Sequence, residues 1–295
     1  MPGVGDRSSQ RRTGNVGADL CVRPVQAQNL RIEPKERRMT QTTEQEPSTA
    51  GLAAASAALE GKTPEEILQW AAREYQPGLT LACSFGGPSG MVLLDMIMQI
   101  DRGVEVFYLD TDFLFPETYK LRDAVAKKYD FQPVGYMSLI TPVEQAAKYG
   151  DALWGRDPDK CCAVRKVEPN ERALAGKRAW ISGIRRDQTK QRANMDIVEW
   201  DEKFGLVKIN PLANWTEALV WKYIFDNGVP YNELHDKNYP SIGCTNCTKA
   251  VLPGEDPRSG RWQGFDKTEC GLHVPEGQTN EHDFGPEGRE AMAQA

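Results

Sequence analysis

The chain has 295 residues, of which 40% are hydrophobic and 26% charged, as in an ordinary soluble globular protein. Its formal net charge of −6 argues against broad binding to nucleic acid or to an anionic membrane surface. No apolar run approaches the ~18–20 residues of a membrane span. We expect no export signal, and seven cysteines at this length do not indicate a secreted disulfide framework, so the expected location is cytoplasmic.

Residues 1–62 have no periodic apolar pattern and are rich in arginine, glutamine, threonine, serine and glycine. Such a composition offers too little burial to offset the loss of chain entropy, so we predict a disordered N-terminal extension. Arginines are typical of a transit peptide, but four acidic residues among the first 38 weaken that interpretation. Met39 opens a second plausible start, so translation from Met39 is an alternative to a natural extension over residues 1–38.

Ordered structure is expected from Thr63, where Thr-Pro-Glu-Glu supplies an N-cap and a proline for the first helical turn. Residues 79–85 then predict a buried strand, followed by a glycine-rich turn over 86–90 and an apolar helix over 91–100. This order of elements cradles phosphate groups, because backbone N–H groups and a helix N-terminus both favour an anion.

Strands and helices alternate further along the chain. Strands are predicted over 104–110, 132–137 and 178–183, helices over 116–128, 142–148, 161–175 and 216–227, and a hairpin or two short strands over 195–210. Alternation predicts a parallel, doubly wound sheet with right-handed crossovers, in which ligands bind at the carboxyl ends of strands. That edge would collect Ser84, Gly86, Gly87 and Asp110.

Arg185 and Arg186 follow the strand predicted over 178–183, and Arg192 comes soon after them. A run of charges usually forms a solvated face. Here the run falls at the carboxyl end of a strand, where such a fold binds its ligand. We therefore predict that at least one of these arginines binds an anionic ligand.

Four cysteines form two close sets, the adjacent Cys161 and Cys162, and Cys244 with Cys247 in Cys-Thr-Asn-Cys. Four thiolates suit a structural zinc ion or an iron–sulfur cluster. Zinc usually takes its ligands from two Cys-x2-4-Cys knuckles, whereas adjacent cysteines diverge by ~100° per residue in a helix. A cluster with several iron corners tolerates that divergence, so it is the preferred interpretation. Zinc, a redox disulfide and simple packing of free thiols are the alternatives.

Residues 251–273, the C-terminal segment, have no periodic pattern and are expected to be mobile. The segment carries a basic Arg-Ser-Gly-Arg-Trp loop and then Glu-Cys-Gly-Leu-His, whose cysteine is Cys270. We expect Cys270 to be exposed, with Lys267 and His273 lowering its pKa and favouring the nucleophilic thiolate. A stray surface thiol is the alternative. Residues 274–295 are polar and are predicted to be disordered.

These motifs together resemble the assimilatory adenylyl-sulfate (APS) reductases of the sulfonucleotide reductase family, over roughly residues 65–273. The motifs that carry the resemblance are Cys-Cys-Ala-Val-Arg-Lys (161–166), Cys-Thr-Asn-Cys (244–247), Arg258-x-x-Arg261-Trp262, Glu-Cys-Gly-Leu-His (269–273), Leu-Asp-Thr (109–111), Pro-Glu-Thr (116–118) and Arg-Arg-Asp-Gln (185–188). The resemblance implies an α/β fold with a doubly wound, mostly parallel sheet of the adenine nucleotide alpha hydrolase-like kind. It also implies a nucleotide-binding reductase domain over 63–250, containing the iron–sulfur site, and a flexible catalytic segment over 251–273.

The activity implied by the resemblance is thioredoxin-dependent reduction of adenosine 5′-phosphosulfate to sulfite and AMP, in assimilatory sulfate reduction. Cys270 would attack the sulfur and form an S-sulfocysteine, from which thioredoxin or a similar dithiol protein releases sulfite. The implied substrate-binding residues are Ser84, Phe85, Gly86, Gly87, Asp110, Lys166, Arg185, Arg192, Arg258, Arg261 and His273.

The resemblance also implies a 4Fe-4S cluster, held by Cys161, Cys162, Cys244 and Cys247. This cluster would not carry the substrate's electrons and would instead position Lys166 beside the anionic substrate. A homo-oligomer is expected, and neither nucleic acid nor a membrane is expected as a partner.

Two places depart from the family pattern. Pro88 and Ser89 stand where the nucleotide loop commonly carries acidic residues, and Asp112 stands where a glycine is usual. The rival functions are a reductase of the 3′-phosphorylated nucleotide (PAPS) or of both nucleotides, an ATP-using thiolation enzyme, and a non-enzymatic iron–sulfur sensor. The loop lacks the aspartate that would hold magnesium for ATP, and a nucleic-acid-binding sensor would need a basic face.

Overall fold

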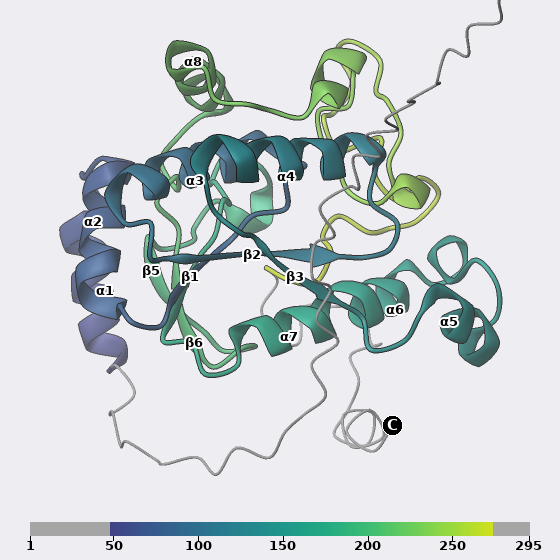
Figure 1. The fold of residues 1–295 in the computed structure, drawn as a ribbon, viewed down its shortest axis with the longest axis horizontal. Helices are drawn as coiled ribbons and strands as arrows, with labels where there is room; N and C mark the ends of the chain where they lie inside the picture. Colours follow the sequence, from purple (N-terminus) through teal and green to yellow (C-terminus); the bar gives the residue numbers. More distant parts are fainter. Residues whose placement is uncertain (1–47, 274–295) are drawn as a thin grey trace, which may run out of the picture.

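The computed structural model describes residues 48–273, shown as the coloured ribbon in Figure 1. The predictions for residues 1–47 and 274–295 lie outside this range. Within it, no helix is long and apolar enough to cross a membrane.

Six strands form one sheet in the order β3-β2-β1-β4-β6-β5. They are β1 (Leu79–Ala82), β2 (Glu105–Asp110), β3 (Val134–Met137), β4 (Ala179–Ile181), β5 (Val198–Asp201) and β6 (Leu206–Ile209). All neighbours run parallel except the hairpin of β5 and β6, so the predicted mostly parallel sheet is confirmed. The chain builds outward from β1 to β3 and then returns to β4 on the other side of β1. A ligand crevice is expected where the strand order reverses in this way.

Helices cover both faces of this sheet, with α3 and α4 on one side and α6 and α7 on the other (Figure 1). The helices are α1 (Thr49–Leu59), α2 (Pro64–Tyr75), α3 (Pro88–Ile100), α4 (Pro116–Tyr129), α5 (Pro142–Tyr149), α6 (Pro158–Cys162), α7 (Glu168–Leu174) and α8 (Glu217–Asn227). The local signals explain their starts, because Thr63 and Thr141 form capping boxes and prolines occupy the first turns of α2 to α6.

The prediction of disorder is wrong for the last part of the N-terminal extension, because α1 lies there. Its Leu52 and Leu59 are buried, and the Ser56 hydroxyl accepts hydrogen bonds from the N–H groups of Ile197 and Val198 at 3.1 and 3.3 Å. Alanine-rich α1 has a weak amphipathic pattern, so its order comes from packing on β5.

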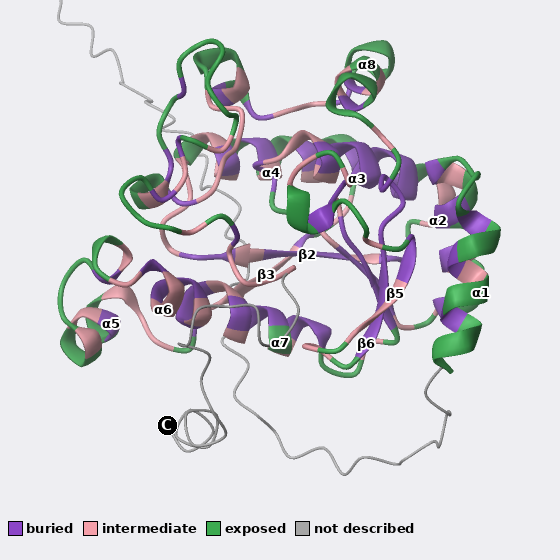
Figure 2. Cartoon of the chain, turned by 180° about the vertical axis from the view of Figure 1, so that it is seen from behind, coloured by how far each residue is buried: buried purple, intermediate pink, exposed green. Residues whose placement is uncertain are grey.

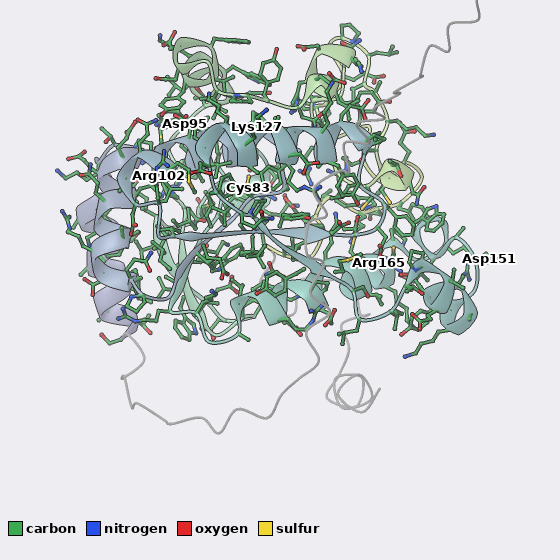
Figure 3. All side chains as sticks on the ribbon, in the orientation of Figure 1. Cys83, Asp95, Arg102, Lys127, Asp151 and Arg165 are labelled. Carbon is green, nitrogen blue, oxygen red and sulfur yellow. The ribbon has the colours of Figure 1, made fainter. Side chains whose placement is uncertain are left out.

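Helix α3 is the centre of the larger hydrophobic core and is buried along most of its length (Figure 2). It contacts α2 and α8, and its buried side chains share one core cluster with those of the sheet. Its Asp95, labelled in Figure 3, accepts hydrogen bonds from Tyr129 of α4 at 2.6 Å and Tyr223 of α8 at 2.9 Å. A buried carboxylate satisfied in this way fixes three helices relative to one another. The start of α3, just after β1, is therefore held rigidly.

The cysteine-bearing helix begins earlier than predicted, at Pro158, and is continuous with α7 through a π-helical turn over Ala163–Val167. A π turn adds a residue to one turn and so changes which side chains face inward. Arg165 and Lys166 lie in this turn, directly after the cysteine pair.

Candidate active site

A cavity of about 480 Å³ lies at the carboxyl ends of β1, β2 and β4 and is closed on one side by the C-terminal segment. Most of the predicted site residues meet there. They are Ser84, Gly86, Gly87, Lys166, Arg185, Arg192, Arg258, Arg261, Cys270 and His273. They come from the loops after the strands, the π-helical turn before α7, the short helix that ends at Arg192 and the C-terminal segment. This cavity is therefore the candidate active site.

Two of the predicted substrate-binding residues do not line the cavity. The side chain of Phe85 is buried in the core, and the Asp110 carboxylate accepts a hydrogen bond of 2.6 Å from the Tyr119 hydroxyl. Thr111, the residue after Asp110, lines the cavity instead. Phe85 and Asp110 therefore affect the site indirectly. Phe85 does so through the backbone of the loop, and Asp110 does so through the adjacent Thr111.

Two residues outside the sequence motifs donate hydrogen bonds to the backbone of the glycine-rich loop. His235 Nε2 donates to the Gly86 carbonyl at 3.0 Å, and Asn232 Nδ2 donates to the Phe85 carbonyl at 3.2 Å. Phe85 itself adopts a left-handed conformation, with φ of 53°. The carbonyl groups of the loop thus point toward the protein. Gly87 precedes α3 and has no side chain that could cap the first N–H groups of the helix, so these N–H groups are left for an anion.

The departures from the family loop have a structural explanation. Pro88 occupies the first turn of α3, where a missing N–H costs no hydrogen bond. Ser89 accepts a hydrogen bond of 2.6 Å from Arg185, which ties this buried arginine to the loop. Arg186, by contrast, pairs with Glu60 and does not line the cavity. Of the arginine pair, only Arg185 is in a position to meet a ligand.

Cationic side chains gather on the side of the cavity formed by the C-terminal segment. Arg192 pairs with Glu269 at 2.6 Å, and Arg258 lies 3.5 Å from the same carboxylate. Arg261 donates to Ser241 at 3.0 Å and lies over the ring of Trp262. The Nε atoms of Arg192 and Arg258 are buried without a hydrogen-bond partner among residues 48–273, so both guanidinium groups retain donors for a ligand.

Cys270 is half-buried among these charges rather than exposed, because the C-terminal segment folds against the cavity. Burial opposes ionisation of its thiol, and so does the negative charge of Glu269. The charge of Lys166, a hydrogen bond from the Leu272 N–H and the charge of Arg192 together outweigh both. The pKa of Cys270 is therefore lower than that of an ordinary thiol.

The predicted causes of that lowered pKa are wrong. Lys267 pairs with Asp159 of α6. His273 is neutral, because burial and then the charges of Arg192, Lys208 and Arg258 hold its pKa well below the usual range. The cations that act on Cys270 instead come from distant parts of the chain.

The four cysteines line a second, small cavity together with Phe113, Trp154, Arg165, Lys166 and Trp262. Among residues 48–273, no three histidine, cysteine or acidic side chains are arranged to hold a single metal ion. Burial, and then repulsion from Cys162 and the other cysteines, raises the pKa of Cys161 to about 12. Sulfur donors that surround a cavity rather than one point fit a larger centre with several metal atoms better than a single zinc ion.

Arg165 (labelled in Figure 3) is almost completely buried beside these cysteines. It donates to Asp112 at 2.6 Å and to Gln145 at 2.7 Å, and its Nη2 has no partner among the described residues. Asp112 has a φ of 61°, which explains why glycine is usual at its position and why aspartate is tolerated there. Thr111 Oγ1 lies 3.2 Å from the sulfur of Cys244. The cysteine cavity thus has polar groups suited to an anionic sulfur-rich group.

Comparison with known proteins agrees with this geometry. Residues 78–250 match the phosphoadenosine phosphosulfate reductase domain family. The chain is 49% identical over 218 residues to the adenosine 5′-phosphosulfate reductase of Shouchella clausii, covering 74% of this chain and 90% of the relative. It is 46% identical over 237 residues to the enzyme of the same name from Salinibacter ruber, covering 80% and 94%.

Proteins named for the other nucleotide are also similar. The phosphoadenosine 5′-phosphosulfate reductase of Gloeobacter violaceus is 48% identical over 220 residues, covering 73% of this chain and 90% of the relative. Among solved structures, the phosphoadenylyl-sulfate (PAPS) reductase of Candida auris in a phosphate complex is 35% identical with a TM-score of 0.61. The match covers 69% of this chain and 98% of that one.

Proposed function

This chain belongs to the phosphoadenosine phosphosulfate reductase family, and on that basis we propose that it reduces adenosine 5′-phosphosulfate to sulfite and AMP. The observation that carries the proposal is the position of Cys270. Its thiol lies in the cavity at the carboxyl edge of the sheet, together with the glycine-rich loop and five cationic side chains. Relatives named adenosine 5′-phosphosulfate reductase, at 46% and 49% identity, support the substrate.

The nucleotide would bind at the glycine-rich loop, where Gly86 and Gly87 expose backbone rather than side chain. Lys166, Arg192, Arg258 and Arg261 would bind the phosphate and sulfate oxygens, which carry the substrate's negative charge. Unpartnered Nε atoms on Arg192 and Arg258 support this assignment.

In the first chemical step the Cys270 thiolate attacks the sulfur of the sulfate group. The new bond joins Sγ to that sulfur, the bond between sulfur and the bridging oxygen breaks, and AMP leaves with the electron pair. The lowered pKa of Cys270 supplies the thiolate, and the surrounding cations would stabilise charge that develops on the leaving phosphate. The product on the enzyme is an S-sulfocysteine.

In the second step one thiol of a dithiol protein, thioredoxin or a similar partner, would attack Sγ of Cys270 and expel sulfite. The partner's second thiol would then break the resulting mixed disulfide and release the Cys270 thiolate. The partner's two thiols become a disulfide, and the two electrons they lose account for the reduction of the sulfate sulfur to sulfite. Cys270 must therefore meet both a small substrate in the cavity and a protein outside it.

A 4Fe-4S cluster is the group that Cys161, Cys162, Cys244 and Cys247 would hold. When bound, it would supply a fixed anionic charge and structural order beside the site rather than electrons for the substrate. Lys166, which lines both the cysteine cavity and the active-site cavity, is the residue positioned between them. Its charge would thereby be directed at the substrate and at Cys270.

Reduction of PAPS, alone or beside APS, is the second candidate, because the Gloeobacter violaceus relative named for it is 48% identical. A direct comparison decides between them. We would measure sulfite release by anaerobically purified protein with reduced thioredoxin, at equal low concentrations of APS and PAPS. Strong preference for APS supports the proposal, and comparable turnover of PAPS indicates an enzyme that uses both.

The variant for this assay is Cys270→Ser, with Cys21→Ser, outside the described residues, as the control. Cys270→Ser should abolish sulfite release while the visible absorbance of the cluster remains. Failure of the unaltered chain to release sulfite from either nucleotide, with the cluster intact, would overturn the reductase function.

A further inference from the structure

The residue before the proposed nucleophile is itself part of the cavity. Glu269 extends its carboxylate inward, and only 7% of its side chain is exposed. One oxygen lies 2.6 Å from Nη2 of Arg192 and 3.5 Å from Nη2 of Arg258, and the other accepts a hydrogen bond of 3.4 Å from Thr189. A buried carboxylate therefore lies between two arginines.

These two arginines are the ones proposed to bind the substrate's oxygens. A carboxylate and a phosphate or sulfate group offer them the same chemistry, an anion with oxygens in one plane or face. Glu269 thus occupies in cis the position of a substrate anion, and it does so from the residue adjacent to Cys270.

The pair is too buried to be broken without a replacement. Removing the partner of a buried ion leaves an uncompensated charge, which is far less favourable than exchanging one anion for another. Arg192 has 9% of its side chain exposed, so we expect it to keep an anion at all times. When the substrate's anion arrives, the group it would replace is Glu269.

The rest of the C-terminal segment limits what would move. Lys267 is anchored to Asp159 of α6 and is 5% exposed, whereas the segment beyond it is held by Glu269, by a hydrogen bond from Arg258 to the Thr268 carbonyl and by the stacking of His273. Displacement of Glu269 would therefore release residues 268–273 about a pivot at Lys267. Cys270 lies in the released part.

We propose that Glu269 is an internal competitor of the substrate's phosphate and sulfate groups for Arg192 and Arg258, so that a bound anion releases the chain around Cys270. This inference rests on the proposed function and extends it. With the arginines occupied by substrate, Cys270 is free to approach the sulfur. With AMP still bound, the S-sulfocysteine is free to meet its reductant. Departure of AMP returns Glu269 to the arginines.

By linkage, tail release and anion binding affect each other equally. Glu269→Gln removes the competing charge. The variant should bind AMP about tenfold more tightly, because a charged hydrogen-bonded pair no longer has to be exchanged. Its residues 268–273 should also exchange backbone hydrogen rapidly without any ligand, whereas the unaltered chain should do so only when AMP is bound.

The experiment combines calorimetric titration with AMP and hydrogen exchange of the peptide that covers 268–273, on anaerobically purified protein. Asp266→Asn is the matched control, because it removes an exposed negative charge three residues away. Glu269→Asp is the second variant, because it keeps the charge. The expected pattern is rapid exchange and tight AMP binding in Glu269→Gln alone, with both controls close to the unaltered chain.

Two results would overturn the inference. One is exchange over 268–273 in Glu269→Gln that equals that of the unaltered chain without ligand, a comparison that needs no nucleotide. The other is rapid exchange in Glu269→Asp to the same degree as in Glu269→Gln, which would make the contact one of shape rather than charge. Neither depends on sulfite release by the unaltered chain, so failure of the proposed function would be recognised separately.

Discussion

The imidazole of His273 lies parallel to the indole of Trp180, with ring centroids 5.6 Å apart and 6° between the planes. Trp180 belongs to the central strand β4, and His273 is the last described residue of the C-terminal segment. The stack thus attaches the end of that segment to the middle of the sheet. Lys208 lies on the same indole, with its Nζ 5.8 Å from the ring centroid.

The stack should contribute to closure of the C-terminal segment. His273→Ala should loosen the segment by about 1 kcal/mol, the usual value of an aromatic pair. His273→Phe should keep most of that stabilisation. Hydrogen exchange of the terminal peptide measures both, and equal exchange in the two variants would show that ring stacking does not hold the segment.

Closure should also weaken as pH falls. The docked imidazole has its pKa held well below the usual range by burial and then by Arg192, Lys208 and Arg258, whereas a released imidazole titrates near ~6.5. Below about pH 6.5 the released segment binds a proton that the docked segment does not. The docked state is therefore fully stable above this pH and becomes less stable as the pH falls below it. An NMR titration of the ring, assigned with His273→Phe, tests this, and titration at the ordinary pKa would contradict it.

Lys166 should act on Cys270 through its charge. Lys166→Met removes the largest favourable influence on the thiolate, so the pKa of Cys270 should rise and sulfite release should fall at least ~tenfold. The pH dependence of Cys270 alkylation measures the pKa directly. Lys190→Met, at an exposed lysine, is the control. Unchanged turnover and APS affinity in Lys166→Met would remove Lys166 from the mechanism.

His235 should affect nucleotide binding and not the thiol. His235→Ala removes the donor that holds the Gly86 carbonyl, a loss of about 1 kcal/mol in loop order, so KM for APS should rise roughly fivefold. The rate of Cys270 alkylation should not change, because the thiol belongs to the C-terminal segment and not to the glycine-rich loop that His235 contacts. A fall in kcat with unchanged KM would argue against a role in holding the loop.

The four cysteines should act as one set of ligands. Cys244→Ser should lose most of the iron and the visible absorbance, whereas Cys21→Ser should retain about four iron atoms per chain. Metal analysis and absorbance of anaerobic protein measure this. One zinc ion per chain, with no visible absorbance, would support the alternative of a structural zinc site.

Periodicity in the sequence was enough to predict the sheet and its ligand-binding edge. Each buried strand is a short apolar run followed by turn residues, and the parallel arrangement follows from the helix between each pair. The sequence also indicated part of the cation cluster. Arg185 directly follows a predicted strand, and Lys166 lies in the helix predicted to begin at the cysteine pair.

Contacts between distant segments were not predictable. His235 reaches Gly86 across 149 positions, and nothing in its own neighbourhood marks it. Nothing in the local sequence distinguishes Glu269 from other acidic residues, and its ion pair with Arg192 is seen only in the structure. The exposure predicted for Cys270 was wrong for the same reason, since a polar local sequence does not reveal that the segment folds over a cavity. Helix α1 was missed because its order depends on a strand about 140 residues away.

The position of α1 beside β5 has a consequence for solubility. β5 is the last strand of the sheet, and an uncovered outer strand offers its backbone N–H and C=O groups to other chains. Ser56 accepts the N–H of Val198 in β5 and that of Ile197 just before it, and α1 lies against the strand. A chain started at Met39 keeps this cover whole. A chain that begins after residue 60 would lack α1 and expose β5. It would aggregate through this edge strand while its active site remained intact.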